Sequence, residues 1–339
     1  MMQAAPATAP AQITELSGVE TIDLSVVSPA ATAHLAPGPS QSAAFDEAHS
    51  AWLMDQGGAF MQFDLNLAGG ETAITEGVAL VLQLCGAADP TSTYDVTVAV
   101  GDTNVVENFS PQAAAFQQQS WYVDATNLQV GSNAIKVALG DVSKGVFLKS
   151  VSVMRFDIQP QELGNWCWCA VSTSTSQFYE AASPWTQSSL ASAVLDLDCS
   201  NAAPACDQIF QLEVALAKTG NLALMVPCPP PGNDYTKSVE GPLTVAQIFE
   251  QINQARPVGA RIGWVYGPNE PTGGGHYIMI TGVGPDQNMI AVEDPISGYW
   301  YKPYASLTVG YTHAYAMWTN SYLTKPDDGT APSPCAEQS

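Results

Sequence analysis

The pattern of apolar residues changes near Phe156, and this change limits the folds open to the chain. Before it, short runs rich in Val, Phe, Tyr and Leu are separated by turn clusters such as Gly69-Gly70 and Asp89-Pro90, a pattern typical of strands. The expected strands are 59–67, 78–84, 94–100, 120–123, 133–139 and 146–156. Short strands at this spacing predict an all-β sandwich, similar to a jelly roll, over residues 21–156.

After Phe156 the spacing becomes helical and then returns to strands. Helices are expected within 161–182, 188–197, 209–218 and 245–255, the last with Thr244 as its N-cap. Strands are expected at 258–266, 276–283, 289–293, 299–302 and 315–322. Helices followed by an antiparallel sheet predict an α+β domain over residues 157–324. The segments 1–20 and 325–339 are expected to be flexible, and the short connection from Val153 to Gln161 favours two domains packed directly together.

Charge narrows the set of partners. Only 10 Lys and Arg stand against 32 Asp and Glu, a formal net charge of −22, so nucleic acid and anionic membrane are not expected to bind. No apolar run approaches the ~18 residues of a membrane helix, so we expect no membrane insertion. Scarce cations in a surface rich in Ser, Thr, Gln and Ala favour export, although no signal segment is visible and a cytoplasmic location stays open.

The seven cysteines leave three interpretations open. Their odd number fits one reactive thiol with up to three disulfides, but all seven could also be reduced in a cytosolic protein. Metal binding is disfavoured because Cys167 and Cys169 lack the spacing of a zinc site and have no matching second pair. The seven positions are Cys85, Cys167, Cys169, Cys199, Cys206, Cys228 and Cys335.

Cys167 is the first candidate for chemistry. A loop precedes it and a helix-compatible stretch, 170–178, follows, so its thiol is expected at a helix N-terminus. Free N–H groups and the helix dipole favour a thiolate there, and a thiolate attacks carbonyl carbon. Cys169 competes for the role, but two residues apart on a helix differ by about 200° around its axis, so only one thiol can face a cleft.

A base must come from one of four histidines, His34, His49, His276 and His313. His276 is the strongest candidate because it follows three glycines and opens the apolar run 277–283, which would leave room for substrate backbone beside it. The next expected strand ends at Asp294, which could lie against the imidazole and fix its tautomer. The other three histidines are expected to be structural.

Gln161 lies six residues before Cys167. Its side-chain amide could stabilise an oxyanion together with the backbone N–H of Cys167. Donors of this kind are worth about 2.7–4 kcal/mol each in other enzymes.

These motifs resemble those of the papain-like cysteine peptidases over residues 159–324. The similarity is greatest to the bacterial branch with an Asn-Trp-Cys-Trp motif, which includes staphopain-like, type III effector and bacteriocin-processing-like members. The matching segments are Gln161, Asn165-Trp166-Cys167-Trp168, Gly274-Gly275-His276 and Asp294-Pro295. Arg256-Pro257-Val258 and Asp198-Cys199 with Cys206 also have counterparts there.

The resemblance implies a role for each matching residue. Cys167 would be the nucleophile, His276 its base, Asp294 the group that orients the base, and Gln161 an oxyanion donor. It also implies a protein or peptide substrate and no cofactor or metal. The chain departs from the family in having Cys169 where the family usually has Ala, and Asn288 remains a weaker rival for Asp294.

Several alternatives stay open. The expected activity is peptide-bond hydrolysis, while the same site could serve an acyl transferase or peptide cyclase, or the fold could be an inert binding protein. The first domain could bind carbohydrate through Trp52, Trp121 and Tyr122, bind a protein, or cover the active site, although sheet cores use the same aromatic residues. Trp166 and Trp168 could be core or substrate platform. Cys199 and Cys206 are expected to form a disulfide if the protein is exported.

Overall fold

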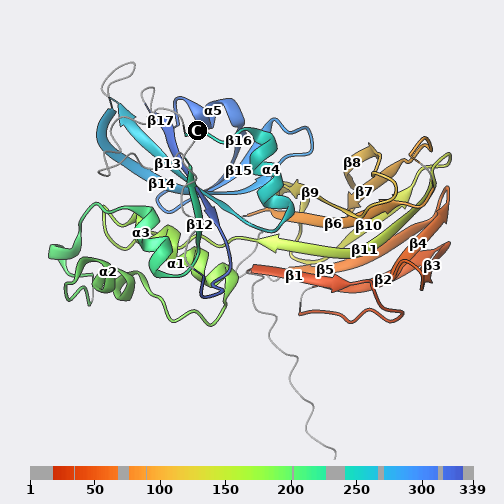
Figure 1. The fold of residues 1–339 in the computed structure, drawn as a ribbon, viewed down its shortest axis with the longest axis horizontal. Helices are drawn as coiled ribbons and strands as arrows, with labels where there is room; N and C mark the ends of the chain where they lie inside the picture. Colours follow the sequence, from red (N-terminus) through yellow and green to blue (C-terminus); the bar gives the residue numbers. More distant parts are fainter. Residues whose placement is uncertain are drawn as a thin grey trace, which may run out of the picture.

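The structure is a computed structural model that describes residues 18–33, 35–67, 76–88, 90–200, 202–226, 241–265, 271–311 and 316–330. It has an N-terminal β-sandwich and a C-terminal domain in which helices cover a sheet (Figure 1). The expected all-β domain followed by an α+β domain is therefore confirmed.

The sandwich consists of two antiparallel sheets. One has the order β3-β4-β11-β6-β9, with β1 also paired to β11, and the other has the order β2-β5-β10-β7-β8. Side chains in β5 alternate between buried and half-buried along the strand, which is the pattern of a sheet with one face in a core. The strands are β1 Gly18–Asp23, β2 Leu35–Gln41, β3 Ala43–Asp46, β4 Ala51–Gln56, β5 Phe60–Leu67, β6 Val78–Gly86, β7 Val96–Val100, β8 Thr103–Phe109, β9 Gln117–Val123, β10 Gly131–Leu139 and β11 Lys144–Arg155.

Five strands of the sandwich were not expected from the sequence: β1 to β4 and β8. β2 contains Pro37 and Pro39 and lies at a sheet edge, where a residue without an N–H is tolerated. β1 begins at Gly18, inside the segment expected to be flexible, and pairs with β11 from Gly18 opposite Arg155 onwards. The rest of that segment, 1–17, and 331–339 of the expected C-terminal tail lie outside the described residues.

The C-terminal domain has a single six-stranded sheet of order β12-β17-β13-β14-β15-β16. Thr186 and Thr244 each form a capping box at the start of a helix, which confirms the expected N-cap at Thr244. The helices are α1 Cys167–Tyr179, α2 Gln187–Leu195, α3 Leu212–Lys218, α4 Val245–Asn253 and α5 Tyr304–Thr308. The strands are β12 Leu222–Val226, β13 Val258–Val265, β14 Pro271–Val283, β15 Met289–Asp294, β16 Gly298–Pro303 and β17 Ala316–Thr324.

One expectation about β14 is corrected. The strand does not open at His276 but begins at Pro271 and continues through the glycines. A Cβ at Gly275 would lie 2.7 Å from the carbonyl oxygen of Ile262 and 3.1 Å from the guanidinium carbon of Arg261. The missing side chain therefore admits the neighbouring strand β13, and the space is not open to substrate backbone.

The two domains pack directly on each other. The Tyr122 ring of β9 stacks on Tyr299 and Tyr301 of β16, with centroid distances of 6.1 and 5.5 Å. A Cβ at Gly282 would lie 2.1 Å from Cδ2 of Tyr122, so only glycine admits this ring. The Tyr299 hydroxyl donates to Asp124 at 2.7 Å. We call this contact the seam: Tyr122 and Asp124 of the sandwich against Gly282, Tyr299 and Tyr301.

A charged cluster is buried beside the seam. Arg155 of β11 is 4% exposed and donates to Glu76 through Nε and Nη2, both at 3.3 Å. Burial and the negative charge of Asp157 raise the pKa of Glu76 to about 7, although Arg155 opposes them. Glu293 of β15 faces the same cluster, and burial followed by the charges of Glu76 and Asp157 raises its pKa well above the ordinary value.

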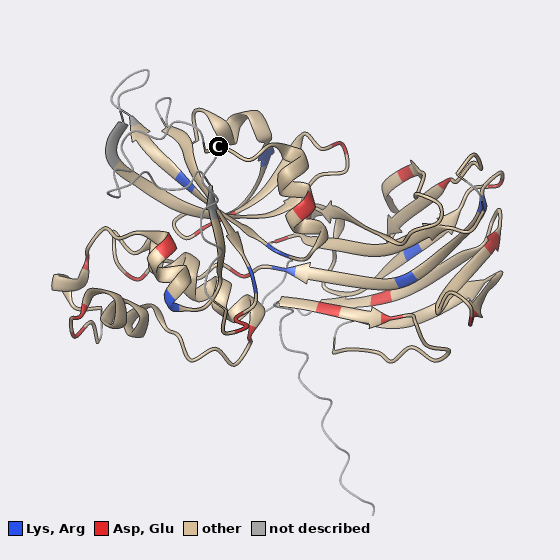
Figure 2. Cartoon of the chain, viewed as in Figure 1, with Lys and Arg blue, Asp and Glu red and all other residues tan. Residues whose placement is uncertain are grey.

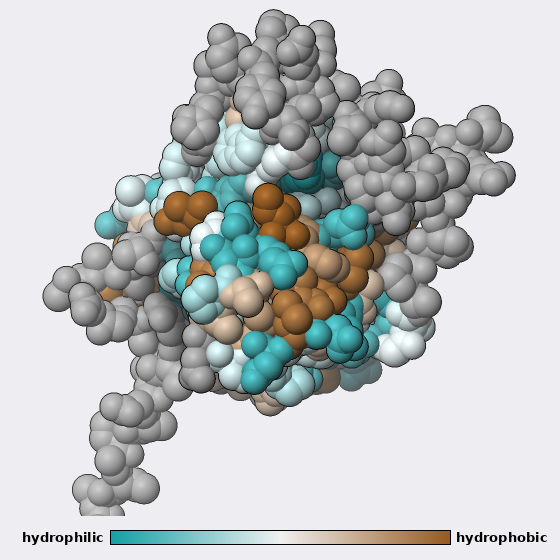
Figure 3. Space-filling view, turned by 90° about the vertical axis from the view of Figure 1, so that its left-hand side faces the viewer, coloured by the Kyte–Doolittle hydropathy of each residue, from teal (hydrophilic) through white to brown (hydrophobic). Residues whose placement is uncertain are grey.

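Charged side chains are sparse over the rest of the molecule. Figure 2 shows the few Lys and Arg positions dispersed over both domains. Seen from the end with α2 and α3, apolar groups lie among hydrophilic ones (Figure 3), and three exposed apolar side chains of this layer are Leu197, Ile209 and Val214. In the described part of the chain, none of the helices has the length and apolar character needed to cross a bilayer.

Candidate active site

Cys167 is the first residue of α1, as the sequence predicts. Trp166 is the N-cap and makes no side-chain capping bond. N–H groups of the first turn have no partner within a helix, so an uncapped start can accept negative charge. The Cys167 thiol is largely buried, with 6% of the residue exposed.

The start of α1 is fixed by a loop closed by a disulfide. Cys199 and Cys206 form this disulfide, the pairing that was expected if the protein is exported. The indole N–H groups of Trp166 and Trp168 donate to the carbonyl oxygens of Cys206 at 2.6 Å and of Gln208 at 3.0 Å. Both indoles are fully buried, so they belong to the core and form no substrate platform.

Asn165 adds two further bonds to the same loop. Its backbone N–H donates to Oδ1 of Asp207 at 2.7 Å, and its side-chain amide donates to the Asp207 carbonyl at 3.1 Å. Every residue of the Asn-Trp-Cys-Trp motif except Cys167 thus holds this loop, which leaves the Cys167 thiol free for another contact.

Cys169 points away from the site. It is fully buried, and its thiol donates weakly to the carbonyl oxygen of Gln187 at 3.6 Å. Burial, followed by the proximity of Cys167 and Glu162, raises the pKa of the Cys169 thiol far above its ordinary value. The expected opposition of the two thiols around the helix is therefore present.

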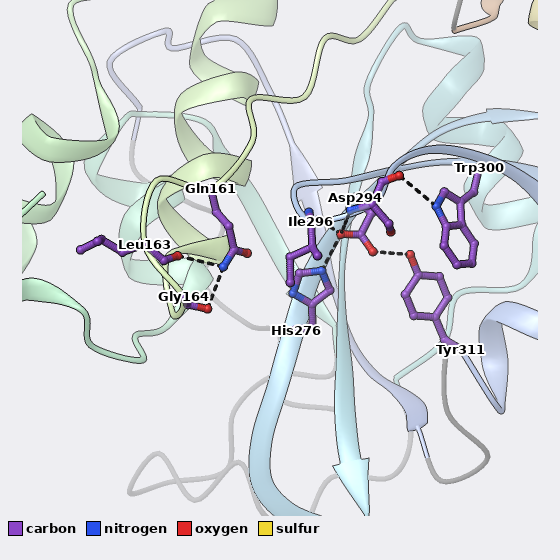
Figure 4. A network of polar contacts seen from close by, with 9 residues as sticks. Gln161, Leu163, Gly164, His276, Asp294, Ile296, Trp300 and Tyr311 are labelled. Atoms are coloured by element: carbon purple, nitrogen blue, oxygen red, sulfur yellow. Dashed lines mark hydrogen bonds and ion pairs between the residues drawn. The ribbon is translucent and has the colours of Figure 1, made fainter. Parts of the chain in front are cut away.

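His276 and Asp294 are brought together by the pairing of β14 with β15. The Nε2 atom of His276 lies 2.8 Å from Oδ1 of Asp294, and both residues are buried. Figure 4 shows Asp294 between His276 and Tyr311. Backbone N–H groups of Ile296 and Ser297 also donate to Oδ1, at 2.8 and 3.3 Å.

The pKa values of the pair move in opposite directions. Burial lowers the pKa of His276, but hydrogen bonds to Asp294 and Cys167 and the charges of both outweigh burial and raise that pKa to about 9. Burial would raise the pKa of Asp294, yet bonds from His276, Ile296 and Tyr311 and the charge of His276 hold it well below its usual value. The contacts thus favour a charged imidazolium between Asp294 and Cys167.

Gln161 lies across the site from His276 (Figure 4). Its side-chain amide nitrogen donates to the carbonyl oxygens of Leu163 at 2.8 Å and Gly164 at 2.7 Å. Its amide oxygen is buried without a hydrogen-bond partner among the described residues. The loop is tied to the Asp294 turn because the backbone N–H of Gln161 donates to the carbonyl oxygen of Pro295 at 3.0 Å.

The rivals for these roles lie elsewhere. Asn288 is exposed and bonds to Asp286 at the far end of β15, about 20 Å from Asp294 at the rise of a strand. His49 bonds to Asp46 at 2.9 Å in the sandwich, and Cys85 is buried there. His34, Cys228, His313 and Cys335 lie outside the described residues.

Two contacts of this site were not expected from the sequence. Gln187 of α2 accepts from the backbone N–H of Glu162 at 3.0 Å and donates to the carbonyl oxygen of Pro160 at 2.9 Å, which fixes the loop around Gln161. Tyr311 donates to Oδ2 of Asp294 at 2.7 Å. No sequence signal separates either residue from an ordinary polar or core residue.

The model of the Peptidase C39-like family matches residues 153–322, half of the chain, and this range includes the whole site. This chain belongs to the Peptidase C39-like family. The C-terminal half is thus a cysteine-peptidase region, as the motifs indicated, and the family is one of cysteine-peptidase-type hydrolases. No curated protein matches the sequence significantly.

Solved structures similar to this C39-like chain carry carbohydrate-binding modules. The CBM36-1 domain of a multidomain xylanase from the hindgut metagenome of Trinervitermes trinervoides is 7% identical, with a TM-score of 0.30, 42% of this chain and 100% of that chain covered. A family 35 module from an environmental isolate is 19% identical, with a TM-score of 0.29 and coverages of 40% and 93%. The Podospora anserina GH26-CBM35 β-(1,4)-mannanase is 13% identical, with a TM-score of 0.30 and coverages of 48% and 34%.

The three aromatic residues considered for sugar binding have other contacts in the C39-like chain. Trp121 is 3% exposed in the sandwich core and Tyr122 is 4% exposed in the seam. Trp52 is half-buried, and its indole N–H donates to the carbonyl oxygen of Val26 at 3.1 Å. A carbohydrate or protein ligand of the sandwich stays a prediction, and these residues do not form one exposed platform for it.

Proposed function

We propose that this protein hydrolyses peptide bonds in a protein or peptide substrate, with Cys167 as nucleophile, His276 as acid and base, and Asp294 as the group that orients His276. The observation that carries the proposal is the contact chain through the imidazole. Asp294 lies 2.8 Å from Nε2 of His276, and the Cys167 thiol is near enough to the same ring to raise the pKa of the imidazole. A nucleophile, a base and an orienting carboxylate in this order are the parts of an acyl-transfer triad.

The first half of the reaction forms a thioester. The Cys167 sulfur attacks the scissile carbonyl carbon while His276 holds a proton. The carbon–nitrogen bond then breaks, and His276 gives that proton to the leaving amine. In this proposal the backbone N–H groups at the uncapped start of α1 stabilise the oxyanion.

The second half releases the acid. Neutral His276 takes a proton from water, and the hydroxide attacks the thioester carbon. The carbon–sulfur bond breaks, and the thiolate and imidazolium are restored. Asp294 stays ionised throughout because its pKa is held low.

Gln161 is proposed as a second oxyanion donor. Both hydrogens of its amide are used by Leu163 and Gly164 in the free protein. Donation to an oxyanion therefore requires that one of these bonds be exchanged when substrate binds.

We also propose that the protein is exported. The Cys199–Cys206 disulfide supports this because such bonds persist in oxidising compartments.

The test is labelling of the full chain with an irreversible epoxide inhibitor of papain-like enzymes, read by intact mass and peptide mapping. One adduct on Cys167 is expected. It should be absent in Cys167→Ala and form roughly 100-fold more slowly in His276→Ala. Cys169→Ala is the matched control, because it removes a thiol from the same helix that points away from the site, and it should label at the wild-type rate.

Other outcomes assign the protein differently. A folded, reduced protein that takes no adduct supports an inert binding fold. Labelling of Cys169 in place of Cys167 would contradict the assignment of the nucleophile. If Cys167 labels, product masses separate hydrolysis from transfer to an amine, because transfer adds the mass of the acceptor and hydrolysis adds that of water.

A further inference from the structure

The two oxygens of the Asp294 carboxylate have different surroundings. Oδ1 accepts from His276, Ile296 and Ser297. Among the described residues, Oδ2 has one donor, the Tyr311 hydroxyl at 2.7 Å. Asp294 is 2% exposed, so solvent is a poor substitute for this donor.

Tyr311 is itself held in place. It is 1% exposed, and its ring packs against Trp300 with a centroid distance of 5.6 Å. The Trp300 indole N–H donates to the carbonyl oxygen of Ser297 at 3.4 Å, so the ring that supports Tyr311 is tied to the turn that follows Asp294. The Lys302 ammonium lies 3.0 Å from the Trp300 centroid and 5.6 Å from that of Tyr311.

A carboxylate needs such support because its last torsion is soft. The χ2 angle of Asp is broad, so bonds to one oxygen alone leave the other free to swing. A swing of Oδ2 would tilt Oδ1 away from the line to Nε2 of His276. A donor on a buried, stacked ring prevents this rotation, and hydrogen bonds to charged groups are among the strong ones.

We propose that Tyr311 is a positioning residue of this site: its hydroxyl pins Oδ2 of Asp294, so that Oδ1 stays aligned with His276 and the imidazolium stays paired with the Cys167 thiolate. The inference rests on the proposed function. Tyr311 contacts neither substrate nor the reacting atoms and acts through Asp294 alone.

The charged groups around this contact are few. Asp294 of β15 faces the Tyr311 hydroxyl, Lys302 of β16 faces its ring, and Glu293 acts on it from the other face of β15. His276 is faced by Asp294 and Cys167. A pH profile of the thiol therefore reports on a short chain of identified groups.

The test is the rate of Cys167 alkylation by iodoacetamide, at pH 5.5 and at pH 9.5, in wild type and Tyr311→Phe. An ordinary thiol is protonated and slow to react at the lower pH, so the rate there depends on the contact with the imidazolium, while an ordinary thiol is ionised at the higher pH without such a contact. We expect Tyr311→Phe to lower the rate at pH 5.5 about tenfold, the size of one hydrogen bond to a charged group, and to leave the rate at pH 9.5 within about twofold. Tyr304→Phe is the matched control, since its hydroxyl donates to the carbonyl oxygen of Leu243 away from the site, and it should change neither rate.

A second pair of variants guards against loss of folding. Asp294→Asn removes the buried charge, and Asp294→Asn/Tyr311→Phe should react like Asp294→Asn at both pH values, because Tyr311 acts only through Asp294. If Tyr311→Phe leaves the ratio of the alkylation rates at the two pH values unchanged, Tyr311 only packs and the inference is overturned. A wild-type thiol without reactivity at pH 5.5 would overturn the proposed function as well, so the two failures are distinguishable.

Discussion

Glu293 and Asp294 are consecutive residues of β15, equally buried at 2% exposure, and their carboxyl groups differ in almost everything else. Asp294 faces the catalytic side, where four donors satisfy its two oxygens and hold its pKa low. Glu293 faces the seam. Its Oε2 has no hydrogen-bond partner among the described residues, and burial with two other carboxyl groups raises its pKa.

The contrast shows that burial alone does not set the charge of a carboxyl group. Desolvation acts on both residues in the same direction, and the donors decide the outcome. On the catalytic side the strand keeps a permanent anion, which is what an imidazolium needs. On the seam side it keeps a carboxyl group that prefers to hold its proton.

The largest effect is expected when the carboxylate on the catalytic side is removed. Asp294→Ala removes the partner that orients His276 and stabilises its charge, so the rate of epoxide labelling at Cys167 should fall roughly 100-fold or more. Glu293→Gln keeps the shape of the side chain and should label within about twofold of wild type. Similar losses in both variants would show that the two faces of β15 do not act separately.

The next largest effect is expected when the packing of the seam is disrupted. Gly282→Ala places a methyl group against Tyr122, and overpacking of this kind should lower the free energy of unfolding by about 1–3 kcal/mol, measured by denaturant unfolding. Labelling of Cys167 in the folded fraction should persist, since Gly282 and the seam lie on the opposite face of the sheet from His276. In a Tyr122→Ala background the added methyl group has no ring to meet, so a further loss of stability there would argue against the clash.

The smallest effect concerns pH. The pKa of Glu76 is raised from an ordinary 4.5 to about 7, so the folded protein binds a proton that the unfolded chain releases. The stability from this group is complete below about pH 4.5 and is lost as the pH rises to about 7. Glu76→Gln should flatten this dependence by on the order of 1 kcal/mol, measured as the midpoint of thermal unfolding from pH 4.5 to 7.5. The exposed Glu250→Gln is the control, and a wild-type slope retained in Glu76→Gln would contradict the assignment to this cluster.

The sequence was most informative where a function depends on residues close together in the chain. Cys167 at a helix start, the opposed Cys169, and His276 with Asp294 on paired strands all follow from local periodicity and short motifs. The strands β1 to β4 and β8 did not follow. β2 contains two prolines and forms a strand through its pairing with β5, and β1 forms one through its pairing with β11, far along the chain.

Contacts between distant segments account for the other differences. Tyr311 reaches Asp294, Gln187 fixes the loop of Gln161, and Tyr122 fills the space over Gly282, and none of these pairs has a sequence pattern of its own. Gly275 was interpreted as room for substrate, whereas β13 and Arg261 occupy that space. A glycine indicates a close approach, but only the fold shows which group approaches.

The alternation of faces along β15 also restricts how this protein can change over evolutionary time. Because successive side chains of a strand point to opposite sides, a shift of the β15 register by one residue would turn the carboxylate of the site toward the sandwich and place Glu293 beside His276. The pairing of β15 with β14 therefore has to keep the register that it has here. For the same reason, a different accessory domain joined to this catalytic half would have to surround the Glu293 carboxyl group and fill the space over Gly282.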